Sequence, residues 1–191
     1  MEQKNILCFG DSNTHGYNSK TGGRFTRQER WTSLLQKQLG DAYYVIEEGL
    51  SGRTTSFEDP VFEGLCGLNA IYPCMMTHEP LDLLMIMLGT NDLLQERQFT
   101  AEDTAQRMED FLKKIMAEPA VSDGKITLRL IAPARMEYGA WVDEERLYLE
   151  SRRLGEEYRK VAERMGTDFT DAGKWEIPVV YDGVHFSEKG H

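Results

Sequence analysis

The sequence has no long hydrophobic run. Its longest uninterrupted apolar segment covers residues 83–88, whereas a helix that spans a bilayer needs about 18 such residues. The apolar stretch near the N-terminus, residues 6–9, is too short for the hydrophobic region of a signal peptide, and Gly10 and Asp11 follow it directly. We therefore expect no membrane insertion and no export, and we predict a cytoplasmic protein.

Clusters of basic residues are missing as well. The chain has 22 Lys and Arg against 32 Asp and Glu, which gives a net charge of −10, and no run of Lys and Arg is longer than a pair. Binding to nucleic acid or to an anionic membrane surface requires a basic face. We therefore expect no nucleic-acid partner and no membrane-surface partner.

Cysteine is scarce. Cys8, Cys66 and Cys74 cannot all pair within one chain, and in an unexported protein we expect three free thiols. Cys8 lies in an apolar run, which is typical of a core residue. Cys74 and His78 have a spacing that suits metal ligands, but no second ligand pair lies nearby in the sequence. We therefore predict no metal site.

The composition is that of a globular protein. Of the 191 residues, 40% are apolar and 28% are charged, which excludes a disordered or collagen-like chain. A chain of this length buries enough surface to fold without disulfides or metals. We predict one domain over residues 1–191 and leave its oligomeric state open, a homo-oligomer included.

Short apolar runs alternate with longer helical patterns along the chain. The runs that predict strands are residues 6–9, 43–46, 83–88, 126–131 and 168–170. The patterns that predict helices are residues 31–39, 65–75, 101–115 and 147–165. Because the central runs are apolar throughout, their strands are expected to be buried on both faces. The alternation predicts an α/β protein with a parallel sheet between helices.

Three local signals refine the helix boundaries. Thr100 and Asp103 resemble a capping box in front of the third helical pattern. Gly40 follows the first pattern and is a common helix end. Pro73 falls inside the second pattern, where we expect it to bend or interrupt the helix.

Polar, Gly-containing segments follow four of the predicted strands. They are residues 10–16, 49–55, 89–92 and 182–185. In open α/β sheets, ligands bind outside the carboxyl ends of the strands. We therefore expect these four segments to meet at one edge of the sheet.

Ser12, Asp182 and His185 have the chemical groups of a nucleophilic triad. A serine hydroxyl needs a neighbouring base, and the base needs a group that fixes its tautomer. Ser12 follows a strand directly, His185 is the best available base, and Asp182 is one turn before it. Each also has an ordinary alternative: a serine that bonds backbone at a turn, a surface histidine, and a D-x-x-H pair that caps a loop.

Gly52 and Asn91 are candidates for stabilising an oxyanion, since the glycine offers a backbone N–H and the asparagine a neutral amide. Their alternatives are a turn glycine and a strand-end asparagine.

The sequence does not favour a phosphate-binding interpretation of residues 10–16. The segment has no G-x-G-x-x-G, no Lys follows Gly16, and Asp11 would place a carboxylate beside the phosphate.

These residues form a recognisable set. Gly10-Asp11-Ser12-Asn13 resembles the GDSL block, and Ser12, Gly52, Asn91 and His185 occur in the order of the four blocks of the SGNH hydrolase family. The sequence is most similar to the arylesterase and acyltransferase branch of that family. The segments that carry this likeness are residues 6–12, 30–32, 45–51 and 81–92.

The resemblance implies a three-layer α/β fold related to flavodoxin, with a five-stranded parallel sheet. It also implies an esterase that needs no metal or cofactor and forms an acyl-enzyme on Ser12. His185 would act as base and then as acid, and Asp182 would orient it. The N–H groups of Ser12 and Gly52 and the amide of Asn91 would form the oxyanion hole.

The sequence departs from the family pattern at several points. Asn13 replaces the Leu of GDSL, and His15 stands where close relatives have Trp, so we expect a more polar pocket rim. We predict that Asn13, Tyr17 and Arg53 bind the substrate. The chain also ends at His191, where the family usually has a further helix. We expect either that the chain is truncated there or that the helix is missing and the sheet edge near His185 is less covered.

The favoured function is hydrolysis of short acyl esters of small alcohols, phenols or sugars, with acyl transfer to an alcohol or peroxide as a side reaction. Within the enzymes, the alternative is a carbohydrate O-deacetylase, which would share the machinery. Outside the enzymes, the alternative is a non-catalytic α/β module that binds an acyl or nucleotide ligand.

Overall fold

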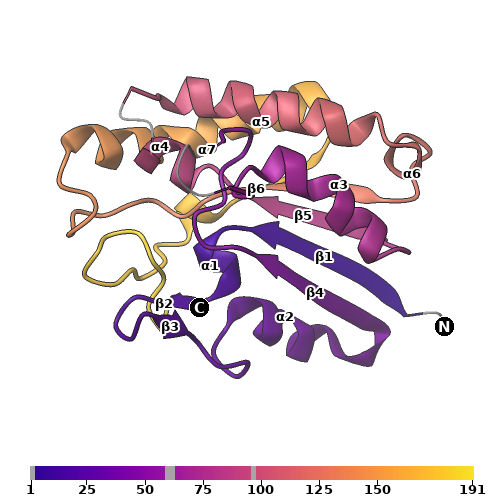
Figure 1. Cartoon of the computed structure of the whole chain (residues 1–191), viewed down its shortest axis with the longest axis horizontal. Coiled ribbons are helices and arrows are strands. Elements are labelled where there is room, and N and C mark those ends of the chain that lie inside the picture. Colours follow the sequence, from indigo (N-terminus) through magenta and orange to yellow (C-terminus); the bar gives the residue numbers. More distant parts are fainter. Residues whose placement is uncertain (1–2, 59–62, 96–97) are drawn as a thin grey trace.

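A parallel sheet of five strands forms the centre of the molecule. The computed structural model describes residues 3–58, 63–95 and 98–191. The strands are β1 (Lys4–Gly10), β4 (Tyr43–Gly49), β5 (Leu83–Met87), β6 (Thr127–Ala132) and β7 (Asp168–Asp171). They lie in the order β4-β1-β5-β6-β7, and every neighbouring pair is parallel (Figure 1). This order is the flavodoxin-like one, and it confirms the predicted fold class and all five predicted strands.

Side chains of β1 alternate between two cores because successive residues of a strand point to opposite faces. Leu7 and Phe9 lie in the larger core, and Ile6 and Cys8 lie in the smaller one on the other face. The uninterrupted apolar run of this strand therefore results from burial on both sides.

Three helices cover one face of the sheet. They are α3 (Gly67–Thr77), α5 (Ala101–Met116) and α7 (Glu145–Met165), which lie together on one side of the strands (Figure 1). Their apolar residues, such as Phe111 and Tyr158, are fully buried against Leu7, Leu84 and Leu130 of the sheet. This face has a continuous core that joins the sheet to all three helices.

The opposite face is covered by one longer helix and a chain segment with little regular structure. Helix α2 (Trp31–Leu39) packs Trp31 and Leu35 on Ile6, and the segment that follows β7 packs Ala172 and Phe186 on the sheet. Helix α2 and residues 172–191 together therefore cover the second face of the sheet.

The predicted helix boundaries agree with the structure except at one proline. Thr100 and Asp103 form a complete capping box at the start of α5, and Gly40 follows the end of α2. Helix α3 continues through Pro73 to Thr77, so the predicted interruption does not occur. Pro73 is exposed, and water can satisfy the carbonyl that loses its helical donor there.

Several short elements were absent from the predicted set. They are α1 (Ser12–His15), β2 (Tyr17–Asn18), β3 (Gly23–Arg24), α4 (Thr90–Gln95), α6 (Pro119–Ser122) and the single 3-10 turns Gly40–Ala42 and Ala172–Lys174. Two of them, α1 and α4, begin in segments where the sequence predicts loops at strand ends. Those two helices carry functional candidates.

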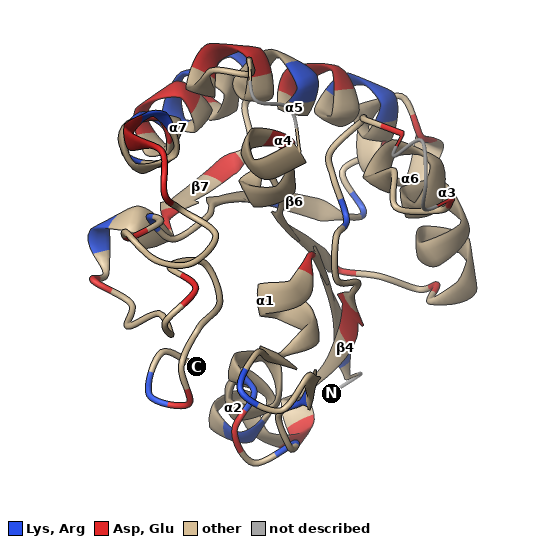
Figure 2. Cartoon of the chain, turned by 60° about the vertical axis from the view of Figure 1, so that its left-hand side comes forward, with Lys and Arg blue, Asp and Glu red and all other residues tan. Residues whose placement is uncertain are grey.

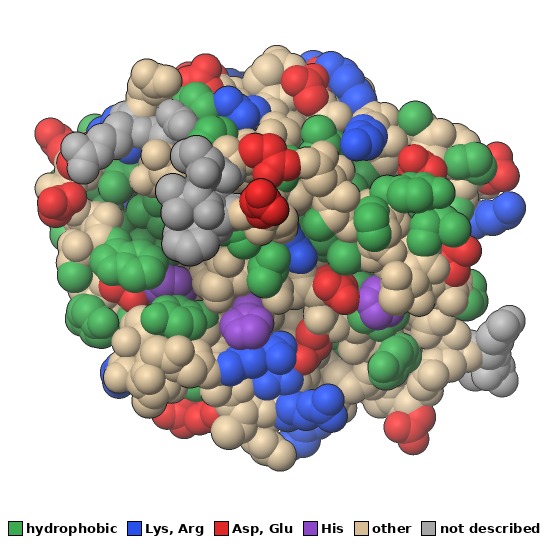
Figure 3. All heavy atoms as spheres, viewed as in Figure 1, with side chains coloured by type: hydrophobic (Ala, Val, Ile, Leu, Met, Phe, Trp, Pro, Cys, Tyr) green, Lys and Arg blue, Asp and Glu red, His purple; other side chains and the backbone are tan. Residues whose placement is uncertain are grey.

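Charged side chains of both signs follow one another along the outer helices α5 and α7 (Figure 2). On the face in Figure 3, acidic, basic and hydrophobic side chains are interspersed. None of the described helices combines the length and the hydrophobicity needed to cross a lipid bilayer.

The three cysteines are free, as predicted, and burial together with nearby Glu47 raises the pKa of Cys8 to about 12.

Candidate active site

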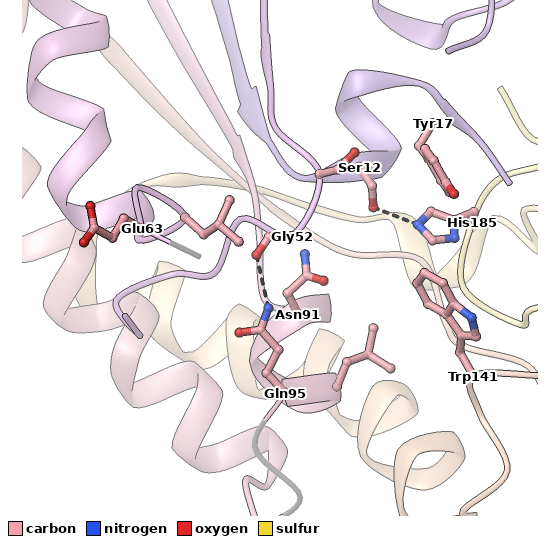
Figure 4. Close-up of a pocket in the computed structure, with 11 residues that line it drawn as sticks. Ser12, Tyr17, Gly52, Glu63, Asn91, Gln95, Trp141 and His185 are labelled. Carbon is pink, nitrogen blue, oxygen red and sulfur yellow. Dashed lines mark hydrogen bonds between the residues drawn. The ribbon is translucent and has the colours of Figure 1, made fainter. Parts of the chain in front are cut away.

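The structure brings Ser12, His185 and Asp182 into direct contact. Ser12 Oγ lies 3.0 Å from His185 Nε2, and His185 Nδ1 lies 2.8 Å from Asp182 Oδ2. The Ser12 side chain points at the imidazole ring across the mouth of a pocket (Figure 4). A hydroxyl, an imidazole and a carboxylate joined in this order can transfer a proton away from the hydroxyl.

A sharp turn from strand to helix positions Ser12. Strand β1 ends at Gly10, and helix α1 begins at Ser12 with Asp11 as its N-cap, which accepts the Asn13 N–H at 2.9 Å. A side chain at Gly10 would come within 2.1 Å of Thr14 Oγ1. Glycine is therefore required at position 10 for the helix to fold back so close to its own strand.

Burial and charge act in opposite directions on Asp11. The carboxyl is fully buried, which raises its pKa to about 6 although the Asn13 N–H, Arg53 and the Thr90 side chain stabilise its charge. The turn that carries Ser12 thus contains a buried acid, Asp11, that is neutral in mildly acidic solution.

The loop that carries His185 is a tight turn fixed by Asp182. Asp182 Oδ1 accepts the backbone N–H groups of Val184 and His185, both at 2.9 Å. Gly183 has a φ of 81°, and a side chain there would come within 2.0 Å of the Glu137 carbonyl oxygen. The D-x-x-H spacing therefore caps the loop with one carboxylate oxygen and contacts the imidazole with the other.

Asp182 is held in its charged form. Burial by itself would raise its pKa, but the backbone N–H groups of His185 and Val184 and the His185 ring outweigh this effect, so the pKa lies below its usual value. An ionised carboxylate fixes the Nδ1–H tautomer and stabilises the ring when it accepts a second proton.

His185 itself is well covered, whereas the expectation of a less covered sheet edge stays a prediction. The residue is only 3% exposed, because the rings of Tyr17 and Trp141 pack on its ring with centroids 4.8 and 4.9 Å away. Beyond it, the Ser187 carbonyl accepts the N–H groups of Gly190 and His191 in a final turn.

Gly52 and Asn91 lie on the other side of Ser12. Gly52 follows β4 with a φ of 83°, and Asn91 belongs to α4, which follows β5. Asn91 donates one amide hydrogen to the Arg53 carbonyl at 3.0 Å and has a second hydrogen that this bond does not use. Both residues line the same pocket as Ser12 (Figure 4).

The next residue of α4, Asp92, anchors this helix. Asp92 is fully buried and accepts the Thr55 N–H at 3.0 Å and the Thr55 hydroxyl at close range. Burial raises the pKa of Asp92, although the bonds from Thr55 oppose the shift. The loop after β4 and the helix after β5 are thereby joined.

The predicted substrate contact of Arg53 is corrected by the structure. Its side chain is buried and donates to the carbonyl oxygens of Gly10, at 3.0 Å, and Glu48, with the guanidinium 4.1 Å from the centre of the Phe9 ring. Arg53 therefore ties the ends of β1 and β4 together and does not line the pocket.

The predicted substrate contact of Asn13 is corrected as well. Its side chain is buried, with Nδ2 3.2 Å from the Val184 carbonyl oxygen and Oδ1 2.9 Å from the Phe186 nitrogen. Both polar atoms are thus engaged with the backbone on either side of His185. Asn13 therefore does not contribute to the polar pocket rim that its replacement of the Leu of GDSL predicted.

The pocket beside Ser12 has a volume of about 1080 Å³. Of the three predicted substrate-binding residues, Tyr17 is the one that lines it. Tyr17 and Trp141 flank His185, and the remaining wall lies on the Gly52 side (Figure 4). The pocket is also lined by Ser51, Glu63, Leu65, Leu94 and Gln95. The sequence analysis did not identify Trp141, since no motif marks the long connection before α7 in which this half-exposed tryptophan lies.

Cys74 and His78 do not belong to a metal site in the described part of the chain. Both contact Glu48, through a Sγ–Oε2 distance of 3.6 Å and a Nε2–Oε1 distance of 2.8 Å. Over residues 3–58, 63–95 and 98–191, no group of three or more His, Cys, Asp and Glu side chains is arranged to hold a metal ion.

Comparisons with known proteins agree with this geometry. The model of the GDSL-like lipase/acylhydrolase family matches residues 8–191. The chain is similar to the structure of the native aryl esterase of M. smegmatis, with 34% identity, a TM-score of 0.87 and coverage of 98% of this chain and 92% of that chain. A comparison with curated proteins gives no match.

Two structures from Sinorhizobium meliloti are similar to the same extent. One is a carbohydrate acetylesterase family member, with 30% identity, a TM-score of 0.90 and coverage of 98% of this chain and 92% of that chain. The other is a carbohydrate acetylesterase, with 32% identity, a TM-score of 0.89 and coverage of 98% and 93%.

Proposed function

The chain belongs to the GDSL-like lipase/acylhydrolase family, and from this membership we propose that it hydrolyses short-chain acyl esters through an acyl-enzyme on Ser12. It is a carboxylic ester hydrolase of the SGNH type. A non-catalytic ligand-binding module, the alternative from another class, is therefore wrong. The roles of the individual residues are the proposal.

In the acylation step, Ser12 Oγ forms a bond to the ester carbonyl carbon while His185 Nε2 takes the hydroxyl proton. The carbonyl oxygen becomes an oxyanion that the N–H groups of Ser12 and Gly52 and the Asn91 amide stabilise. The bond to the alcohol then breaks, and the alcohol leaves with the proton from His185. Asp182 remains ionised and stabilises the charged ring.

In the deacylation step, a water molecule gives a proton to His185 while its oxygen attacks the acyl carbon. The bond to Ser12 Oγ breaks, Oγ recovers the proton, and a carboxylic acid is released. An alcohol or peroxide that takes the place of water yields an ester or a peracid instead. We propose this acyl transfer as a side reaction of the same intermediate.

The observation that supports this function best is the buried chain of contacts from Ser12 through His185 to Asp182, with distances of 3.0 and 2.8 Å, at the mouth of a pocket. The test is Ser12→Ala. It should abolish covalent labelling by an organophosphonate and reduce ester turnover by about 10³- to 10⁶-fold. Ser122→Ala on α6, away from the pocket, is the matched control. Unchanged turnover in Ser12→Ala would remove the nucleophile assignment.

The short acyl length is tested separately. Leu65 and Leu94 offer apolar surface in the pocket that Ser12 lines, and we propose that the acyl group packs against them. A series of p-nitrophenyl esters from acetate upward should show kcat/KM falling beyond a short chain. A rise through octanoate would contradict the short-chain assignment.

A carbohydrate O-deacetylase is the second candidate. It is supported by polar side chains of Glu63 and Gln95 beside the rings of Tyr17 and Trp141 in the pocket, a mixture that suits a sugar, and by the carbohydrate acetylesterases among the similar structures. Aryl acetates compared with acetylated xylose or glucosamine would separate the two candidates, because a deacetylase should prefer the sugars in kcat/KM.

We also propose that residues 1–191 form one hydrolase domain. The single five-stranded sheet and a core that reaches from β1 to α7 support this. The cytoplasmic location, the lack of a nucleic-acid partner and any homo-oligomer stay predictions from the sequence.

A further inference from the structure

The triad joins two segments from opposite ends of the chain. Ser12 lies in helix α1, which β1 positions, whereas His185 lies in a connection without helix or strand. Within that connection, Asp182 caps the turn, and the His185 carbonyl accepts the Val180 N–H at 2.8 Å. These bonds fix the shape of the loop but not its position relative to Ser12.

Asn13 forms a direct hydrogen-bonded link across this junction, in addition to the Tyr17 ring that packs on His185. Its amide donates to the Val184 carbonyl at 3.2 Å and its Oδ1 accepts the Phe186 N–H at 2.9 Å. These two backbone groups belong to the residues immediately before and after His185. Asn13 follows Ser12 directly, so one side chain connects the residue beside the nucleophile to both sides of the histidine.

Asn13 is itself held in place. Its N–H bonds Asp11 at 2.9 Å, and its carbonyl accepts the Trp31 indole N–H at 3.1 Å. The side chain is 6% exposed, so solvent has little access to these bonds. A buried asparagine with donor and acceptor both satisfied is a rigid connection between backbone segments.

We propose that Asn13 is a positioning residue of this esterase, which sets the distance from His185 Nε2 to Ser12 Oγ by clamping the histidine loop to the nucleophile turn. The inference rests on the proposed function. Leucine, which the GDSL block has at this position, has a similar branched outline to asparagine but neither hydrogen-bonding group. Proton transfer needs the two atoms in contact, and a displacement of about 1 Å can reduce turnover by about 100-fold.

The first test is Asn13→Leu, which keeps the outline of the side chain and removes both bonds. We expect kcat and the maximal rate of organophosphonate labelling of Ser12 to fall together by about 10- to 100-fold, with KM changed less than about threefold. Ile115→Val in the distant core of α5 is the control for lost stability. It should lower the melting temperature and leave kcat and labelling unchanged.

A second variant, Asn13→Asp, separates the clamp from packing. In its protonated form the introduced carboxyl group can donate to Val184 and accept from Phe186, whereas its ionised form has no donor. The ratio of wild-type to variant kcat/KM should therefore be at least about fivefold larger at pH 9 than at pH 5.5. Asp11, Asp182 and His185 are present in both proteins, so the ratio removes most of their own contribution to the pH dependence.

Two outcomes would overturn the inference. One is folded Asn13→Leu with wild-type kcat and labelling, and the other is an Asn13→Asp ratio that is the same at both pH values. Failure of the proposed function has a different signature, since Ser12→Ala would then keep its turnover whatever side chain stands at position 13.

Discussion

The two halves of the proposed active site are built differently. The proposed proton-transfer half consists of the side chains of Ser12, His185 and Asp182. The proposed oxyanion half consists of Gly52 and Asn91, which would act together with the N–H of Ser12. In the sheet, β1 lies between β4 and β5, with Gly10 opposite both Gly49 and Met87. The oxyanion half therefore follows from strand pairing, because its two residues come shortly after the strands that flank the nucleophile. No described strand of the sheet leads directly into the segment that carries His185.

Because the two halves are held differently, the loss of a hydrogen bond is expected to affect them differently. The oxyanion half is joined locally, by the Asn91 bond to the Arg53 carbonyl and by the Asp92 bonds to Thr55. The proton-transfer half relies on side chains that hold an irregular loop, namely Asp182 within it and Asn13 across it. A lost bond in the second half can therefore move a reacting group, whereas a lost bond in the first half mainly removes or weakens a donor.

The largest effect is expected for Asp182→Asn. The amide can fill the same space but cannot stabilise a positively charged His185, and it favours the wrong tautomer. We expect kcat to fall by about 10⁴-fold, measured with a p-nitrophenyl ester at neutral pH. A loss below tenfold would mean that the carboxylate only caps the loop, and the two halves would then differ less than described.

Asn91→Ala is expected to be next. It removes one oxyanion donor and leaves the Ser12–His185 contact in place, so kcat should fall by about 10²- to 10³-fold. Organophosphonate labelling of Ser12 should still occur at a reduced rate. If labelling is abolished altogether, Asn91 also supports the proton-transfer half, which would contradict its assignment to the oxyanion half alone.

Asp11→Asn tests the buried acid of the nucleophile turn. Its pKa is about 6 in the folded protein against an ordinary value of 3.8, so unfolding releases a proton between these pH values and wild-type stability falls as pH rises through them. The amide does not titrate and keeps the acceptor for the Asn13 N–H. Relative to wild type, the variant should gain up to about 3 kcal/mol in free energy of unfolding from pH 3.5 to 7.

Urea denaturation of both proteins at several pH values between 3.5 and 7 measures this difference. All other carboxyl groups are shared, so their titration largely drops out of the comparison. A difference that does not change with pH would contradict the raised pKa of Asp11.

The smallest effect is expected for Arg53→Lys. Lysine keeps the charge but lacks the planar guanidinium, which lies 4.1 Å from the centre of the Phe9 ring and donates to the Gly10 and Glu48 carbonyls. The strands on either side remain paired, so kcat should fall only about tenfold with KM little changed. A loss as large as that of Asn91→Ala would show that Arg53 controls the oxyanion half directly.

The sequence predicted the sheet because its strands carry a local signal, and local motifs also pointed to Ser12, Asp182 and His185, whose roles stay proposals. Apolar runs buried on both faces identify β1, β5 and β6, and the motifs around Ser12 and His185 are short enough to read directly. The predictions for Asn13 and Arg53 were wrong because a polar residue near a site has no sequence signal that tells substrate contact from backbone support. Trp141 was missed because its loop has no motif.

By itself, the sequence determined the alternation of strands and helices and the residues able to form a triad, since hydrophobic periodicity and local turn chemistry depend on neighbours along the chain. Only the tertiary structure decided which polar side chains face the pocket and which hold it together. That choice depends on contacts between segments at opposite ends of the chain, such as Asn13 and Val184, and the geometry of such contacts exists only once the sheet and its covers have packed.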